Sequence, residues 1–245
     1  MGEAIITRRS VGVGADAFAF IVVTYSGGTC TCTNGTTTLT HSGGGIQAFG
    51  VDQAGTWTVT ATETYTSDTK TVTISQKGEI KEITLTYTYT LFNNGVVNNI
   101  SWVTAGNSSC KVGSTLYLFA NHNYSGGTKA LAAISTANKI DLTNYKTLYF
   151  TVSSASCSGT SNYNYSRGGV SSNTGEGSTA SNAGSLSTYS TICGRGDSFS
   201  SSKTISVDIK GYGSMHVKIA GEANDNGISG TAQTIATITK VWATS

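Results

Sequence analysis

The chain has 245 residues, of which 38% are hydrophobic and 11% are charged, and its formal net charge is +2. This length and apolar content can fill one large core or two ordinary ones, which excludes global disorder. The small net charge and the scattered Lys and Arg do not supply the basic surface that nucleic acid binding needs. Few charged residues, with Thr, Ser and Gly in their place, predict an all-β protein without long amphipathic helices.

The amino-terminal segment shows no convincing export or membrane signal. The apolar run Ala17–Val23 is short and no basic region leads directly into it. No run approaches the roughly 18 apolar residues of a membrane span. We therefore expect a protein made in a bacterial cytoplasm, without a signal peptide. Five cysteines without metal-binding spacing predict mostly free thiols, no metal site and no cofactor.

Residues 1–89 are predicted to form one β-sandwich of about seven short strands, separated by Gly, Asn and Asp turns. The expected strands are Ala4–Thr7, Ala17–Thr24, Thr29–Thr33, Thr36–Thr40, Gly45–Ala48, Thr56–Thr62, Thr69–Ser75 and Ile80–Tyr87. The pattern AGTWTVTAT, TKTVTIS and ITLTY resembles the last strands of bacterial and phage Ig-like modules. That resemblance covers Phe20–Tyr87, implies an attachment or assembly module, and places Trp57 between the sheets.

The segment Glu79–Phe92 alternates apolar residues with Thr and is the clearest strand pattern in the chain. At roughly 3.3 Å per residue it is too long for one strand of a small sandwich. We therefore interpret it as two elements. The first half closes an amino-terminal domain, residues 1–89, and the second half opens a domain of residues 90–245.

Residues 90–245 contain longer strands and longer polar loops, which suit a jelly-roll β-sandwich of eight strands. The expected strands are Ile100–Thr104, Thr115–Ala120, Lys129–Ile134, Thr147–Ser153, Thr188–Cys193, Thr204–Ile209, Ser214–Ala220 and Gln233–Ala243. The segments KIDLTNYKTLYFTV and ATITKVWATS resemble a core strand and the last strand of galactose-binding-like and carbohydrate-binding modules. The resemblance implies that Asp141 caps a turn and that Leu142, Leu148 and Phe150 face the core.

The two domains in this order, rich in Thr, Ser and Gly, resemble virion proteins of tailed phages and prophages, such as tail, fibre or decoration proteins. The resemblance implies a virion location, contacts with other virion proteins and with a host-surface glycan, and a homo-oligomer. A purely architectural virion subunit that binds no sugar is the first alternative. A glycan-degrading enzyme on a β scaffold is the second.

The residues Ser153–Ser187 form the longest polar stretch and are expected to be a loop. Tyr163, Tyr165 and Arg167 stand there among small residues, a mixture typical of binding loops. Aromatic rings stack on the apolar faces of sugars, so Trp102 and Tyr189 are further candidate ligand-binding residues. The alternative is an irregular hairpin in which the two loop tyrosines cover the sheet.

Catalysis has little support in the sequence, and a non-enzymatic function is expected. A hydrolase triad needs a nucleophile, a histidine and an acid that converge. The histidines His41, His122 and His216 lie in no nucleophile context, and no pair of carboxylates is marked by its spacing.

Overall fold

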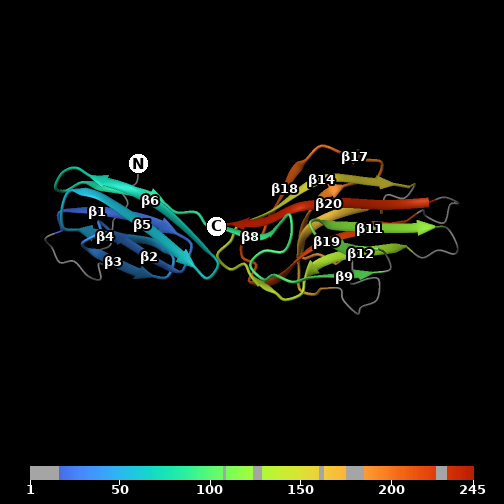
Figure 1. The fold of residues 1–245 in the computed structure, drawn as a ribbon, viewed down its shortest axis with the longest axis horizontal. Helices are drawn as coiled ribbons and strands as arrows, with labels where there is room; N and C mark the ends of the chain where they lie inside the picture. Colours follow the sequence, from blue (N-terminus) through green and yellow to red (C-terminus); the bar gives the residue numbers. More distant parts are fainter. Residues whose placement is uncertain (1–16, 107–108, 124–128, 160–162, 175–184, 225–230) are drawn as a thin grey trace. The chain divides into compact units, whose positions relative to one another are not determined.

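The computed structural model describes residues 17–106, 109–123, 129–159, 163–174, 185–224 and 231–245. Every regular element in these ranges is a β-strand, which confirms the all-β prediction. The described part of the chain contains no apolar helix of the length that a membrane span requires. The expected strand Ala4–Thr7 lies outside the described residues. The chain divides into two compact units between Thr88 and Tyr89 (Figure 1).

The amino-terminal unit is a β-sandwich of a three-stranded and a four-stranded sheet, ordered β4-β1-β7 and β3-β2-β5-β6. Its strands are β1 (Ala19–Tyr25), β2 (Thr29–Thr33), β3 (Thr38–Ser42), β4 (Gly45–Val51), β5 (Gly55–Glu63), β6 (Thr66–Ile74) and β7 (Ile80–Thr84). Strand β1 pairs with β7 in parallel and with β4 in antiparallel orientation.

Alternation of small apolar and Thr side chains builds the core of this unit. On β5, Trp57, Val59 and Ala61 are fully buried and the Thr residues between them are not, as the sequence predicted for Trp57. On β2, burial raises the pKa of the Cys30 thiol to about 11 and that of Cys32 to about 12. Both thiols therefore act as small apolar core groups.

The strand order of this unit differs from that of immunoglobulin domains. Seven strands in the constant-type immunoglobulin order would give sheets 1-2-5-4 and 3-6-7. Here the orders are 3-2-5-6 and 4-1-7. The resemblance to Ig-like modules therefore covers the two-sheet sandwich and the number of strands, and does not extend to their connectivity.

The long alternating segment is split into two elements, as its length indicated. Strand β7 ends at Thr84 and β8 spans Thr88–Asn93, where it pairs with β20 of the second unit. Tyr89 is buried and its ring packs 5.7 Å from that of Tyr145. That the two units fold independently stays a prediction.

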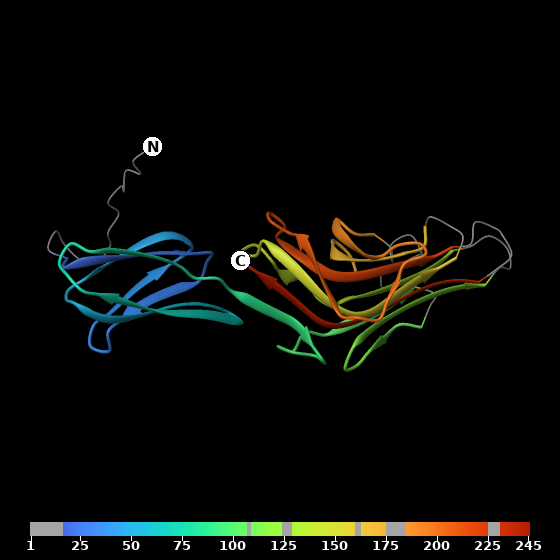
Figure 2. The same cartoon turned by 90° about the horizontal axis from the view of Figure 1, so that it is seen from above.

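The carboxy-terminal unit consists of two larger sheets (Figures 1 and 2). One has the order β10-β11-β20-β14-β17, with β8 beside β20 and β18 beside β14, and the other has the order β16-β15-β19-β12-β9, with β13 beside β19. The strands are β9 (Trp102–Gly106), β10 (Lys111–Val112), β11 (Leu116–Asn123), β12 (Ala130–Thr136), β13 (Ile140–Asp141), β14 (Thr147–Ser158), β15 (Tyr165–Ser171), β16 (Thr188–Cys193), β17 (Ser198–Phe199), β18 (Lys203–Asp208), β19 (Ser214–Ala223) and β20 (Thr231–Thr244).

The order of the eight main strands is that of a jelly roll. Strands β11, β12, β14, β15, β16, β18, β19 and β20, counted one to eight, give antiparallel sheets 1-8-3-6 and 2-7-4-5. This is the double Greek-key arrangement that the sequence predicted. Leu142, Leu148 and Phe150 are fully buried, and Asp141 Oδ1 accepts hydrogen bonds from the Thr143 amide (3.0 Å) and hydroxyl (2.6 Å).

The prediction that Ser153–Ser187 is one long loop is wrong. Strand β14 continues to Ser158, and Tyr165–Ser171 forms β15 in the interior of a sheet. Two glycines show which face of that sheet is internal, because a Cβ on Gly168 would lie 3.0 Å from the Phe150 ring of the opposite sheet and one on Gly221 would lie 2.8 Å from Leu118. Residues that alternate with these glycines therefore point outward.

Candidate functional site

Three of the five candidate residues predicted from the sequence lie on the outer face of the β16-β15-β19-β12-β9 sheet. They are Tyr165, Arg167 and Tyr189. On β15 the outward residues include Tyr165 and Arg167. The antiparallel register places Tyr165 opposite Glu222 of β19. On the other side of β15, Gly169 pairs with Tyr189 of β16. The sheet thus brings together residues that are up to 57 positions apart in the chain.

The guanidinium of Arg167 lies between two tyrosine rings. Its central carbon is 3.8 Å from the centroid of the Tyr165 ring and 4.3 Å from that of the Tyr189 ring. The cation therefore makes a cation–π contact with each of the two rings, and such contacts contribute about 0.5–2 kcal/mol each. We call this group, Tyr165, Arg167 and Tyr189, the Tyr–Arg stack.

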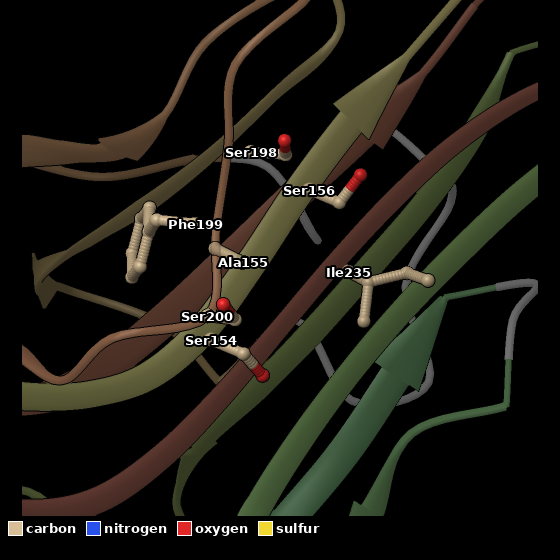
Figure 3. A pocket seen from close by; sticks show the side chains of 7 residues that line it. All are labelled: Ser154, Ala155, Ser156, Ser198, Phe199, Ser200 and Ile235. Carbon is tan, nitrogen blue, oxygen red and sulfur yellow. The ribbon is translucent and has the colours of Figure 1, made fainter.

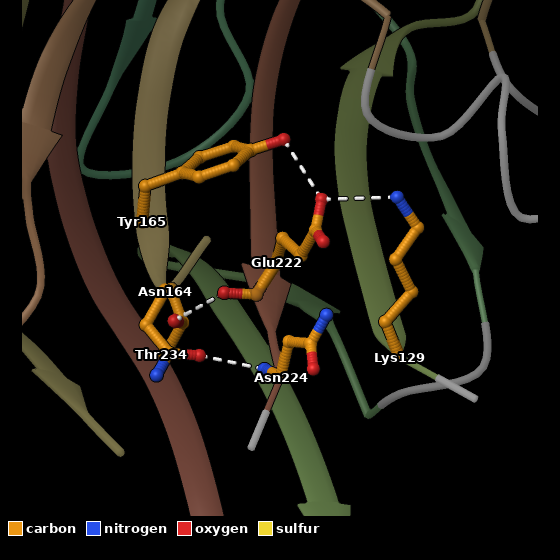
Figure 4. A network of polar contacts seen from close by, with 6 residues as sticks. All are labelled: Lys129, Asn164, Tyr165, Glu222, Asn224 and Thr234. Carbon is orange, nitrogen blue, oxygen red and sulfur yellow. Dashed lines mark hydrogen bonds and ion pairs between the residues drawn. The ribbon is translucent and has the colours of Figure 1, made fainter. Parts of the chain in front are cut away.

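Glu222 fixes one end of the stack. Its side chain is only 5% exposed, and Oε2 accepts a hydrogen bond from the Tyr165 hydroxyl (3.1 Å) and pairs with Lys129 Nζ (3.3 Å), as Figure 4 shows. Burial, followed by the negative charge of Glu222, raises the pKa of the Tyr165 hydroxyl to about 12. This hydroxyl therefore stays protonated and continues to donate at physiological pH.

Hydrogen bonds at the same end join β19, and the residue that follows it, to the segment before β15 and to β20 of the opposite sheet. The Asn224 amide donates to the side-chain oxygen of the fully buried Asn164 at 2.6 Å. The Thr234 hydroxyl donates to the Glu222 carbonyl at 2.7 Å. Because these groups are part of the strand framework, the stack is built on a rigid surface.

The same face becomes apolar and buried toward β12 and β9. Leu131 and Ala133 are almost fully buried there, and Ala105 packs against them. Lys218, beside Ser135 on the neighbouring strand, is also fully buried, and its ammonium lies 3.5 Å from Asn173 Oδ1. Burial lowers the pKa of this ammonium to about 8. The accessible part of the face is therefore the side formed by β15 and β16.

The structure separates the five residues that the sequence proposed. Tyr163 is 61% exposed just before β15, Tyr189 is 45% exposed, and Tyr165 and Arg167 are half-buried in the stack. The inclusion of Trp102 is wrong, because this side chain is buried on the inner face of β9 with its ring 6.0 Å from that of Phe92. A buried indole cannot present a platform to a sugar.

Sequence reasoning missed Glu222 and Lys129. The sequence predicts that this strand ends at Ala220, before Glu222, whereas β19 continues to Ala223. No local signal marks the Glu222–Tyr165 pair, since it depends on the register between two strands. Within the described residues, no group of three or more His, Cys, Asp or Glu side chains is placed to hold a metal ion.

A second surface lies on the outer face of the opposite sheet, where a shallow cavity of about 430 Å³ opens between β14, β17 and β20 (Figure 3). It is lined by Ser154, Ala155, Ser156, Ser198, Phe199, Ser200 and Ile235. On β11 of the same sheet, Tyr117 and Phe119 stack with their centroids 6.2 Å apart. The Lys203 ammonium lies 4.3 Å from the centroid of the Phe199 ring, so the wall of the cavity is partly cationic.

Comparison with known proteins gives only distant similarities. No protein-family model and no curated protein matches the chain. Among solved structures, one from a study of promiscuous specificity in carbohydrate-binding modules of the β-sandwich superfamily aligns at TM-score 0.33 and 11% identity, over 87% of this chain and 84% of its own. The K1 cleaved adhesin domain of Lys-gingipain from Porphyromonas gingivalis W83 aligns at TM-score 0.29 and 17% identity, over 64% of this chain and 89% of its own.

A pore-forming toxin candidate from Bacteroides vulgatus ATCC 8482 aligns at TM-score 0.18 and 11% identity, over 94% of this chain and 92% of its own. All three scores and identities are low. The functional argument therefore rests on the side chains of this chain.

Proposed function

We propose that the carboxy-terminal unit binds carbohydrate at the Tyr–Arg stack and that the protein is a non-enzymatic adhesion protein. The observation that carries this proposal is the guanidinium of Arg167 held between Tyr165 and Tyr189, with Tyr189 45% exposed. Sugars have apolar ring faces that stack on aromatic side chains, and hydroxyl groups that accept hydrogen bonds from guanidinium N–H donors. The stack offers both kinds of group on one rigid sheet.

The arrangement supports binding without catalysis. The carboxylate of the site, Glu222, is buried and engaged by Tyr165 and Lys129, which leaves it poorly placed for general acid or base work on a bound sugar. A retaining or inverting glycosidase needs two carboxyl groups across one sugar. Strands β9, β12, β15, β16 and β19 carry one carboxylate on this face, Glu222, and Asp141 of β13 lies opposite Ser214 at the other end of β19.

We further propose that the adhesion role is exercised on a phage or prophage particle, as a homo-oligomer in contact with other virion proteins. The support is the sequence layout, a small sandwich followed by a jelly roll. The architectural alternative, a subunit that binds no sugar, predicts the same particle location without glycan binding. Electron microscopy of particles labelled with an antibody to this chain tests the location, and sedimentation of the purified protein tests the oligomer.

The binding proposal is tested with the full chain on an array of bacterial and host oligosaccharides, followed by calorimetry on the best ligand. Tyr189→Ala and Arg167→Ala should weaken binding by about tenfold or more, since each removes a contact surface of the site. Tyr65→Ala is the control for Tyr189→Ala, because it removes another exposed tyrosine, in the amino-terminal unit. The exposed fraction is 60% for Tyr65 and 45% for Tyr189. Unchanged affinity in both site variants, or no bound glycan at all, would refute the proposal.

A further inference from the structure

The Tyr–Arg stack contains a cation that no carboxylate neutralises. Among the described residues Arg167 forms no ion pair, and the carboxylate at the end of the stack, Glu222, is engaged by Lys129 and Tyr165. The Arg167 Nε atom is buried and has no hydrogen-bond acceptor in the described structure. An unpaired donor on a half-buried cation is destabilising, and a negative group beside the guanidinium would offset part of that cost.

The surroundings of the cation favour one geometry of acceptor. The rings of Tyr165 and Tyr189 both lie close to the guanidinium, with centroids 3.8 and 4.3 Å from its central carbon. The N–H groups along the edge of the guanidinium plane form a fork of donors that matches the two oxygens of a carboxylate. A lone hydroxyl would satisfy one of these donors, whereas a carboxylate satisfies two in parallel.

The charge of the surrounding face favours an anion as well. Around the stack the described cations are Arg167, Lys129 and the buried Lys218, and the described carboxylate is Glu222. Lys218 lies opposite Gly169 on the neighbouring strand, in the row next to Arg167. The low dielectric around the buried Lys218 and the half-buried Arg167 strengthens their attraction for a negative group.

We propose that the ligand of the Tyr–Arg stack is an acidic saccharide, in which a uronate or sialate carboxylate pairs with the edge of Arg167. The sugar ring then contacts the exposed ring of Tyr189. This inference rests on the proposed carbohydrate-binding function and specifies the chemical class of its ligand.

The decisive comparison needs no variant. Binding of the full chain is measured by calorimetry to oligogalacturonate and to the same oligomer with its carboxyl groups methyl-esterified. The second pair consists of a sialylated oligosaccharide and its carboxyl-reduced form. The acidic member of at least one pair should bind about tenfold or more tightly than its neutral counterpart, with an advantage that falls as salt increases. Sulfated oligosaccharides are the third arm, because sulfate has the charge without the planar two-oxygen geometry.

Variants then test the fork itself. Arg167→Lys keeps the charge but loses the paired donors, and should lower affinity for the acidic ligand by about tenfold while affinity for neutral glycans changes little. Equal binding of acidic and neutral members, or tighter binding of sulfated glycans, would overturn the acidic-saccharide inference and leave carbohydrate binding standing. Absence of binding to every glycan would overturn both.

Discussion

Replacing Tyr165 by Phe removes one hydroxyl and tests the network that positions the stack. The hydroxyl donates to a carboxylate whose side chain is 5% exposed, so its loss deprives a buried charge of one of two described partners. Hydrogen bonds to charged groups contribute about 1.5–3 kcal/mol to stability. The remaining partner, Lys129, still pairs with the carboxylate after the change, which places the expected loss near the lower limit, about 1.5 kcal/mol.

Tyr165→Ala also removes the ring beneath the guanidinium and should lose roughly 3 kcal/mol, in the range of aromatic core truncations. Tyr163→Ala is the control, because an exposed side chain shifts stability by no more than about 0.5 kcal/mol. Native-state hydrogen exchange of the β15 and β19 amides in the full chain measures the opening free energy of this unit by itself. An unchanged value for Tyr165→Phe, or a Tyr163→Ala loss as large as that of Tyr165→Ala, would refute the reasoning.

Other regions of the fold give four further predictions. Burial lowers the pKa of Lys218 to about 8, so between about pH 8 and 10.5 the unfolded chain holds a proton that the folded chain has released, and stability rises with pH. The free energy of unfolding in urea, measured for wild type and for Lys218→Met, should differ by an amount that rises with pH by up to about 3 kcal/mol. A difference that does not change with pH would contradict this prediction. The buried thiols are Cys30, Cys32, Cys157 and Cys193. Iodoacetamide at pH 8 should label them slowly in the native protein and rapidly after denaturation, and equal rates would show that the thiols are accessible. Trp102→Ala should destabilise by about 3–5 kcal/mol in urea unfolding without a selective effect on glycan affinity, and a stable variant with weakened binding would return Trp102 to the site. Residues 89–245 expressed alone should melt cooperatively in calorimetry, whereas aggregation of this fragment would show that the units depend on each other.

The parts of the fold that sequence could predict are those set by local pattern. Alternation of apolar residues and Thr marks β5 and β14 directly, because side chains of a strand face opposite sides in turn. The turn cap at Asp141 and the core positions of Leu148 and Phe150 were implied by the resemblance of this segment to carbohydrate-binding modules, and the structure has both. The strand order of the amino-terminal unit could not be predicted, since it depends on pairings between residues far apart in the chain.

Strand β15 escaped prediction for a specific physical reason. Its sequence YSRGGVS has the composition of a loop, yet both glycines are required by close approaches inside the fold. A side chain at Gly168 would press on the Phe150 ring, and one at Gly169 would lie 2.0 Å from the Thr188 carbonyl oxygen. Tertiary contacts thus override the low strand propensity of glycine. Once this strand was read as a loop, the pairing of Tyr165 with Glu222 could not be found.

The Tyr–Arg stack orders the side chain of Arg167 in the folded protein. A free arginine side chain loses about 2 kcal/mol of rotamer entropy when it is fixed, and a binding site on a mobile loop would meet this loss at each binding event. In this protein the two tyrosine rings and the Glu222 contact hold the guanidinium in place during folding. The burial of Nε without an acceptor works against folding stability. In the proposed function the ordering of the side chain is thus completed during folding, and binding of a ligand no longer carries that entropy cost.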